Sequence, residues 1–281
     1  MADVLSGRKL ARQVRERVRQ QVSSLDDPPG LTVIVVGDDP ASKVYVSYKE
    51  KACIKTGFRS SVIRMPGDVT REQLLAEIHR INADDSVDGL LVQLPLPGHL
   101  SPSEVASAVV PAKDVDGFHP QNVGRLWRGE EGLFPCTPTG VMALLDFHGI
   151  DPEGMHAVIV GRSDIVGKPL AAMLLAANAT VTLAHSRTRD LAGLTSRADL
   201  LVSAVGSPGI IGPEHVREGA VVVDVGISRT EDGLAGDVDY RRVEPLVSAI
   251  TPVPGGVGPL TIAFLLENTI KAGKLRREGL L

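Results

Sequence analysis

Short apolar runs alternate along the chain with segments of helical period, and this alternation predicts an α/β fold. In the first half the pattern predicts strands at 31–36, 61–65 and 88–94 and helices at 42–56 and 70–82. In the second half it predicts strands at 157–160, 180–184, 200–204, 221–225 and 249–253, then an amphipathic helix at 260–271. Strands that alternate with helices pair in parallel through helical crossovers, so we expect parallel sheets.

The length of 281 residues fits either two domains or one large α/β domain. Segment 111–138 is rich in glycine, proline and charge, and it has no sustained apolar period. We therefore expect a domain boundary near Pro120. The expected domains are 1–120 together with 259–281, and 121–258, with the last helix packing back on the first domain.

Composition excludes several classes of protein. Hydrophobic residues make up 43% and charged residues 23%, as in ordinary globular proteins. A net charge of −4 without any basic block gives no reason to expect nucleic acid. Cys53 and Cys136 form no C-x-x-C, the histidines form no H-x-x-x-H, and we expect no metal site. No apolar stretch is long enough to cross a bilayer, so we expect a cytoplasmic protein.

Residues 160–169 read V-G-R-S-D-I-V-G-K-P, between the apolar run 156–160 and a helical segment at 170–177. Glycines at 161 and 167 let the backbone approach a phosphate, and a helix N-terminus supplies free N–H donors. The sequence therefore predicts a nucleotide-binding turn. The spacing departs from G-x-G-x-x-G, and a βα turn that merely needs room has the same appearance.

The end of the next strand indicates which nucleotide binds. His185-Ser186-Arg187-Thr188-Arg189 follows it, where an NAD-selective fold usually places a carboxylate. A hydroxyl and guanidinium groups there, with Arg162 in the first turn, suit the 2′-phosphate of NADP. The alternative is that Arg187 and Arg189 are ordinary solvated charges.

Further polar groups have both a chemical and a structural interpretation. Tyr45 and Lys49 stand four residues apart and share a helix face, as would a surface lysine over a half-buried tyrosine. Gln93 ends an apolar strand, where open α/β sheets bind ligands. Asp114 and Asp116 either form a turn with Asx hydrogen bonds or supply a carboxylate to a heterocycle. Residues 254–259 (P-G-G-V-G-P) either cap a helix or lie flat against a ligand.

Five ordered motifs resemble those of bifunctional methylenetetrahydrofolate dehydrogenase/methenyltetrahydrofolate cyclohydrolase. They are S-x-x-Y-V-x-x-K-x-K at 42–51, V-Q-L-P-L-P at 92–97, K-D-V-D-G at 113–117, G-R-S-x-I-V-G-x-P at 161–169 and P-V-P-G-G-V-G-P at 252–259. They extend over almost the whole chain. The resemblance implies two α/β domains with the active-site cleft between them, the first binding folate and the second a Rossmann-like sheet that binds NADP.

The resemblance further implies NADP-dependent oxidation of 5,10-methylenetetrahydrofolate to the methenyl cation and its hydrolysis to 10-formyltetrahydrofolate, a one-carbon donor for purine biosynthesis. Lys49 is then the essential residue for hydrolysis, Tyr45 lies over the folate, Gln93 hydrogen-bonds the lysine and Asp116 holds the pterin. A lysine serves as base only where it is partly neutral, and the sequence leaves open whether Lys49 is a base or orients water. Residues Pro254, Gly255 and Gly256 would also contact the substrate.

By the same resemblance, the cofactor contacts are Gly161, Arg162, Ser163, Ile165, Gly167, Ser186, Arg187 and Ile227. Ser228 departs from the asparagine that is common in the family, which affects only the expectation for local loop contacts. A homodimer is also implied. Two rivals remain open: a dehydrogenase without the hydrolytic step, and a non-catalytic protein that senses NADP or folate.

Overall fold

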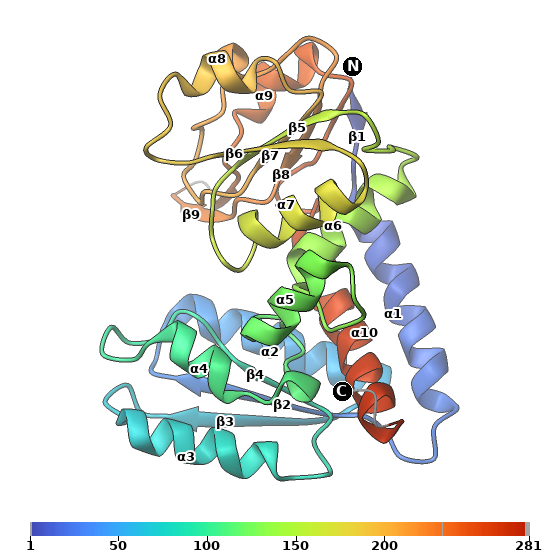
Figure 1. Cartoon of the computed structure of the whole chain (residues 1–281), viewed down its shortest axis with the longest axis vertical. Coiled ribbons are helices and arrows are strands. Elements are labelled where there is room, and N and C mark those ends of the chain that lie inside the picture. Colours follow the sequence, from blue (N-terminus) through green and yellow to red (C-terminus); the bar gives the residue numbers. More distant parts are fainter. Residues whose placement is uncertain (1, 232, 279–281) are drawn as a thin grey trace. The chain divides into compact units, whose positions relative to one another are not determined.

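The structure is a computed structural model that describes residues 2–231 and 233–278 (Figure 1). The chain divides into two compact units. One, which we call the three-stranded unit, comprises residues 12–136 and 262–281. The other, which we call the six-stranded unit, comprises residues 1–11 and 137–261. Among the described helices, none combines the length and the apolar character that crossing a membrane requires.

The three-stranded unit is built on a parallel sheet of order β3-β2-β4. Its strands are β2 (Gly30–Val36), β3 (Arg59–Met65) and β4 (Gly89–Val92). The helices that belong to it are α2 (Pro40–Thr56), α3 (Arg71–Asn82), α4 (Pro102–Ala108) and α5 (Pro120–Arg128), with a 3₁₀ turn at Pro111–Lys113. Side chains of β2 and β4 pack with those of α3 and α4 in one apolar cluster, which includes Ile34, Leu74, Ile78, Leu90 and Val105. This sheet has the predicted parallel arrangement.

Local capping explains where two of these helices begin and end. Asp39 accepts a hydrogen bond from Ser42 N (2.7 Å) and Pro40 occupies the first turn, so α2 begins there. Gly57, at φ 85°, ends the same helix in the left-handed conformation. Thr70 and Gln73 form a capping box at the start of α3. These caps fix where α2 begins and ends and where α3 begins.

The six-stranded unit has a parallel sheet of order β1-β11-β8-β7-β5-β6. Its strands are β1 (Asp3–Val4), β5 (His156–Val160), β6 (Thr180–Ala184), β7 (Leu200–Ser203), β8 (Val221–Asp224) and β11 (Ala249–Ile250). Figure 1 shows α8 (Leu191–Thr195) and α9 (Tyr240–Val243) on one side of the sheet and α7 (Gly167–Ala176) on the other. The connections leave β5 toward β6 and then return to β7, so the strand order reverses beside β5. Open α/β sheets bind ligands at the carboxyl ends of strands at such a reversal.

Smaller elements complete the six-stranded unit. An antiparallel hairpin of β9 (Ser228–Thr230) and β10 (Gly233–Ala235) follows β8. The 3₁₀ turns Pro213–His215 and Glu244–Leu246 precede β8 and β11 respectively. The core of the sheet is apolar, with Val158, Leu201, Val222 and Ile250 all inaccessible to solvent.

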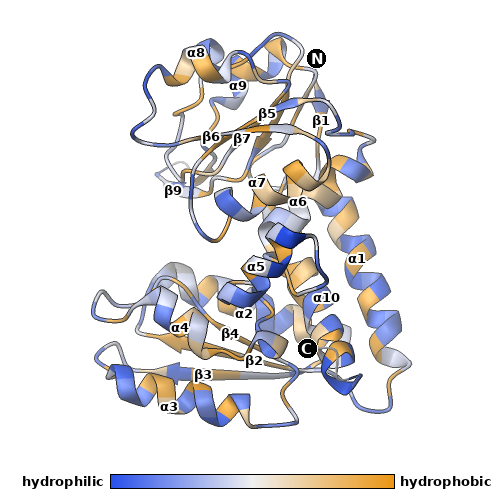
Figure 2. Cartoon of the chain, viewed as in Figure 1, coloured by the Kyte–Doolittle hydropathy of each residue, from blue (hydrophilic) through white to orange (hydrophobic). Residues whose placement is uncertain are grey.

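Three longer helices contain the limits between the units. They are α1 (Gly7–Ser23), α6 (Cys136–Phe147) and α10 (Gly258–Arg277). In Figure 2, α1 shows blue and orange residues alternating along its length. The buried side chains of α1 are Ala11, Val14, Val18 and Val22, which recur at helical spacing and form its apolar face.

The observed units differ from the expected ranges in three respects, of which the smallest is that the limit in α10 lies at 261/262 instead of 258/259. The limit lies at 136/137 instead of near Pro120, because the segment 111–138 contains α5 and the start of α6 instead of a linker. Residues 1–11 group with the six-stranded unit because β1 pairs in parallel with β11, Asp3 opposite Ala249. The predicted strand 249–253 was also too long. It ends at Ile250, after which Thr251 turns to hydrogen-bond Asp224 N through its hydroxyl.

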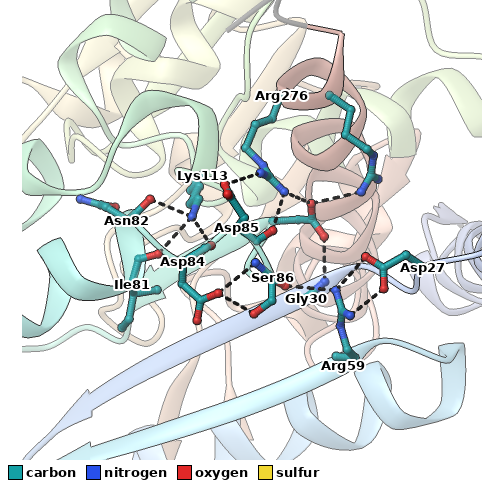
Figure 3. Close-up of polar contacts among 12 residues, drawn as sticks. Asp27, Gly30, Arg59, Ile81, Asn82, Asp84, Asp85, Ser86, Lys113 and Arg276 are labelled. Carbon is teal, nitrogen blue, oxygen red and sulfur yellow. Dashed lines mark hydrogen bonds and ion pairs between the residues drawn. The ribbon is translucent and has the colours of Figure 1, made fainter.

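A polar cluster ties the end of α10 to the amino edge of the three-stranded sheet (Figure 3). Asp88, which is buried, accepts hydrogen bonds from Gly30 N and Arg276 Nη2, both at 2.9 Å. Lys113 Nζ donates to the carbonyls of Ile81, Asn82 and Asp84 at the end of α3. The cluster therefore fixes β2, β4, α3 and α10 at the edge opposite to the carboxyl ends of the strands.

Candidate active site and cofactor turn

Lys49 and Gln93 meet at the carboxyl end of β4 in the three-stranded unit. Lys49 lies in α2 and is 8% exposed, and its Nζ donates a 2.9 Å hydrogen bond to Gln93 Oε1. The Gln93 Nε2 donates in turn to Leu94 O at 2.6 Å, which orients the amide so that its carbonyl faces the lysine. The structure thus brings together two residues that sequence placed on separate elements. An amine held almost out of water beside an oriented amide is suited to binding a small polar reactant.

Tyr45 lies one turn before Lys49 on α2. Its side chain is 40% exposed, so the phenol is accessible while the lysine beneath it is not. Lys51, two residues beyond Lys49, is exposed on another face. Lys49 and Lys51, two lysines of the same helix, therefore differ in their burial.

Asp114 and Asp116 differ in role: Asp114 makes the hydrogen bonds of the turn, and Asp116 has the free carboxylate that a heterocycle could bind. Asp114 is buried and accepts hydrogen bonds from Phe118 N, His119 N and Asn122 Nδ2, at 3.1, 2.8 and 2.8 Å. Asp116 is half-buried, and among the described residues its carboxylate accepts no hydrogen bond. Burial raises the pKa of Asp116, and the positive charge of Lys49 lowers it. Asp114 therefore holds the loop, while Asp116 keeps both oxygens available to a ligand.

Two residues that sequence reasoning did not assign hold the loop that carries Asp116. Asn268 Nδ2 of α10 donates to Val115 O and Phe134 O, both at 2.8 Å. Cys136 Sγ donates to the same Val115 carbonyl at 3.3 Å, and burial raises the pKa of this thiol. Spacing gave no signal for this contact, because Asn268 is far away in the sequence. Within the sequence of α10, Asn268 is only one polar residue among several.

The turn after β5 has the backbone geometry of a phosphate cradle. Gly161 has φ 128°, and a Cβ on it would lie 2.4 Å from Ala204 O. A Cβ on Gly167 would lie 2.2 Å from Gly161 O, so both glycines are required by close backbone approach. Ser163 Oγ accepts from Val166 N and Gly167 N, at 3.2 and 3.3 Å. The serine therefore satisfies donors at the start of α7, a structural role in addition to the expected cofactor contact.

Unpaired cationic groups surround this turn. Arg162 in the turn and Ser186 and Arg187 after β6 are exposed, and β6 is the direct neighbour of β5. Within the described part of the chain, the guanidinium groups of Arg162 and Arg187 make no hydrogen bond or ion pair. The nearby Asp164 is paired with Lys168. This arrangement fits a bound phosphate, because two guanidinium groups without a partner and a hydroxyl follow two adjacent strands, and the one carboxylate in the turn is paired with a lysine.

The other expected ligand contacts of the six-stranded unit lie at the same sheet edge or beyond β11. Ile165 and Ile227 are 39% and 38% exposed, as apolar contacts for a planar ring require. Gly255 has φ 116°, its carbonyl accepts from Gly7 N at 3.0 Å, and Gly256 N donates to Pro252 O at 2.8 Å. This loop therefore supports the start of α1, and Pro254 is its exposed residue.

Comparison with known proteins assigns both units to one family. Residues 5–116 match the model of the tetrahydrofolate dehydrogenase/cyclohydrolase catalytic domain, and residues 135–277 match the NAD(P)-binding domain of the same family. The bifunctional protein FolD of Thermus thermophilus is 55% identical over 278 residues, covering 99% of this chain and 98% of its own. FolD of Wolinella succinogenes is 54% identical over 280 residues, covering 98% of each chain.

Solved structures agree with this assignment. The FolD methylenetetrahydrofolate dehydrogenase/cyclohydrolase of Campylobacter jejuni has a TM-score of 0.95 at 49% identity, covering 98% of this chain and all of its own. The Trypanosoma brucei enzyme, solved with NADP cofactor and an inhibitor, has a TM-score of 0.93 at 37% identity and covers 98% of each chain. The resemblance inferred from the five motifs is confirmed. The chain is an enzyme with a catalytic and an NAD(P)-binding domain, and it belongs to the tetrahydrofolate dehydrogenase/cyclohydrolase family.

Proposed function

We propose that this chain oxidises 5,10-methylenetetrahydrofolate with NADP⁺ to the 5,10-methenyl cation and hydrolyses that cation to 10-formyltetrahydrofolate. The presence of both family domains supports the pair of activities. The hydrogen bond between Lys49 and Gln93 carries the hydrolytic half, because it holds an amine at the carboxyl edge of the catalytic domain's sheet. The three-stranded unit binds the folate, and the six-stranded unit binds the nucleotide.

In the hydrolytic step, water adds to the methenyl carbon and loses a proton, after which the bond from that carbon to N5 breaks and N5 is protonated. Lys49 Nζ is the group that activates the attacking water, either as a base or by orienting it. Gln93 holds the amine in place through its carbonyl oxygen, and Tyr45, exposed one turn away, covers the folate ring. The reaction gains from this positioning because the water and the carbon meet in a fixed geometry.

Asp116 recognises the pterin. Its carboxylate suits the adjacent ring N–H and amino donors of that heterocycle, a charge-assisted pair of hydrogen bonds. Asp114, Asn268 and Cys136 hold the loop so that the Asp116 oxygens remain unpaired until the substrate binds. This pairing orients the one-carbon bridge.

The six-stranded unit holds the nucleotide, which supplies the hydride acceptor when it is bound. Arg162, Ser186 and Arg187 bind the 2′-phosphate, the basis of preference for NADP over NAD. The turn formed by Gly161, Ser163, Ile165 and Gly167 receives the pyrophosphate, and Ile227 contacts the ring. The guanidinium groups of Arg162 and Arg187, which have no partner among the described residues, and the lack of any carboxylate in segment 185–189 support this preference.

An absorbance assay with 5,10-methylenetetrahydrofolate and NADP⁺ tests the proposal. The bifunctional enzyme forms NADPH and does not accumulate the methenyl species. A dehydrogenase alone forms NADPH and accumulates that species, and a sensing protein forms no NADPH. Either of these last two outcomes would reject the proposed pair of activities.

Assembly and compartment form a separate part of the proposal. We infer that the enzyme is a cytoplasmic homodimer that binds tetrahydrofolate derivatives and no nucleic acid. Family resemblance supports the dimer, and two buried free cysteines, Cys53 and Cys136, support a reducing compartment. Light scattering of the purified chain at micromolar concentration tests the dimer, because a monomeric mass would reject it.

A further inference from the structure

Two buried aspartates, Asp224 and Asp237, lie at the carboxyl edge of the six-stranded sheet. Asp224 ends β8 and is 3% exposed, and Asp237 follows the β9–β10 hairpin and is fully inaccessible. Neither belongs to the residues assigned above to the substrate or the cofactor.

Asp224 fixes both ends of the segment 226–238, which contains the β9–β10 hairpin. Its Oδ1 accepts from Gly226 N and Asp237 N, at 2.9 and 3.0 Å. Its Oδ2 accepts from Val238 N at 2.9 Å. The departure from β8 and the return at Asp237 are therefore held by one carboxylate.

Asp237, which is held in this way, binds in turn the loop that follows β7. Its Oδ2 accepts from Ser203 Oγ and Val205 N, at 2.9 and 2.7 Å, and its Oδ1 accepts from Ser207 N at 2.8 Å. Ser228 Oγ, at the start of β9, adds a 3.1 Å bond to Gly206 O in the same loop. The loop 204–207 is thus anchored to the segment that follows β8.

The backbone packs so closely around the two carboxylates that neighbouring positions must be glycine. A Cβ on Gly226 would lie 2.1 Å from Asp237 Oδ1, and a Cβ on Gly236 would lie 2.0 Å from Asp224 Oδ2. Burial, with the neighbouring charge of Asp237, raises the pKa of Asp224 to about 6. Two carboxylates close together out of water are costly, so a network of this kind is a candidate for function.

The anchored loop lies directly against the cofactor turn. Ala204 N donates to Val160 O at 2.8 Å, and the Ala204 carbonyl is the group that excludes a side chain at Gly161. Val205, whose N–H is bound by Asp237, and Ile227, which follows the Gly226 bound by Asp224, are 44% and 38% exposed. A shift of the loop would therefore move both the wall of the cradle and two exposed apolar side chains beside it.

We propose that Asp237, anchored through its own backbone N–H by Asp224, is a positioning residue for the dinucleotide cofactor. It sets the loop 204–207 against Gly161 and does not itself contact the nucleotide. This inference rests on the proposed function, since it assumes that the cradle after β5 binds NADP.

Calorimetric titration of the full chain with NADP⁺ tests the inference on Asp237→Asn. The amide cannot accept from all three donors, so we expect NADP⁺ to bind about tenfold more weakly, which is about 1.4 kcal/mol. Ser203→Ala removes one donor and should weaken binding in the same direction by about threefold. Hydrolysis of supplied methenyltetrahydrofolate should keep its normal rate in both variants, because that step uses no nucleotide.

Asp199→Asn is the matched control. Asp199 is a carboxylate of the same unit that accepts from His156 N at 2.9 Å and pairs with Arg217, but at the amino edge of the same sheet. We expect its NADP⁺ affinity to stay within about twofold of the parent. Parent-like affinity in Asp237→Asn and Ser203→Ala, or equal loss in Asp199→Asn, would overturn the positioning role alone. Absence of NADP⁺ binding by the parent chain would overturn the proposed function and this inference with it.

Discussion

The Lys49 amine donates to the Gln93 side-chain carbonyl at 2.9 Å, and this contact joins α2 to the end of β4. Gln93 is fixed on its other side by the Leu94 carbonyl, so the amide cannot turn its nitrogen toward the lysine without losing a hydrogen bond. The amine is therefore held by a neutral hydrogen-bond partner. No carboxylate among the described residues forms an ion pair with it.

Replacing this amine should separate the two activities. We expect Lys49→Met to reduce hydrolysis of methenyltetrahydrofolate by at least about a hundredfold, because methionine fills a similar volume but handles no proton. NADP⁺ affinity should stay normal. Decay of the methenyl absorbance, with Lys51→Met as the exposed control on the same helix, measures the effect. Parent-like hydrolysis by Lys49→Met would reject its assigned role.

The 2′-phosphate assignment predicts a selective effect on one nucleotide. Arg162→Ala should weaken NADP⁺ binding by about 1.5–3 kcal/mol, the range for a hydrogen bond to a charged group, with little effect on NAD⁺. Titration of one variant with both nucleotides provides its own control, since the two ligands differ only in that phosphate. Equal losses for both would show that Arg162 supports the fold of the turn instead.

The repetitive part of the fold could be predicted from the sequence. Strand β6 has the predicted limits, 180–184, and β2 and α3 differ from prediction by one residue, because apolar runs and the Thr70 cap are local signals. Helix α1 was not predicted although its buried residues recur at helical spacing, since arginines dominate the segment between them. Strand β1 was not predictable in this way, because only its pairing with β11 makes two residues a strand.

The candidate site shows the same division between local and long-range signals. Lys49, Gln93 and Asp116 were predicted as site residues because each lies within a short motif, and these assignments stay predictions. Asp237 and Asn268 were not predicted, since each acts on backbone groups that are distant in the sequence. Such contacts are decided by how the chain folds back on itself, and a one-dimensional pattern does not contain that information.

The polar cluster in Figure 3 predicts a large difference between two neighbouring aspartates. Asp88→Asn should lower the free energy of unfolding by about 2–3 kcal/mol, because one of the two oxygens that accept from Gly30 N and Arg276 becomes a donor and the buried charge that faces Arg276 is lost. Asp85→Asn should change it by less than about 0.5 kcal/mol, since the Asp85 side chain is 99% exposed although it pairs with the same arginine. Urea unfolding of both variants measures this, and equal effects would show that burial does not decide the contribution.

Asp114 predicts a pH-dependent contribution to stability with a definite sign. Burial raises its pKa from an ordinary 3.8 to about 6, so between these values the folded chain holds a proton that the unfolded chain has released. The contribution of Asp114 is therefore fully present below about pH 4 and is lost as the pH rises through about 6.

Unfolding free energies of the parent and of Asp114→Asn, measured by guanidinium denaturation from pH 4.5 to 7.5, test this. Over this range the advantage of the parent should shrink as the pH rises, by about 2 kcal/mol, and then level off above about pH 7. Asp224 has a similarly raised pKa but titrates in both proteins, so its effect cancels in the difference. A difference that grows with pH would mean that the hydrogen bonds from Phe118 N, His119 N and Asn122 outweigh burial and keep this carboxyl ionised in the folded state.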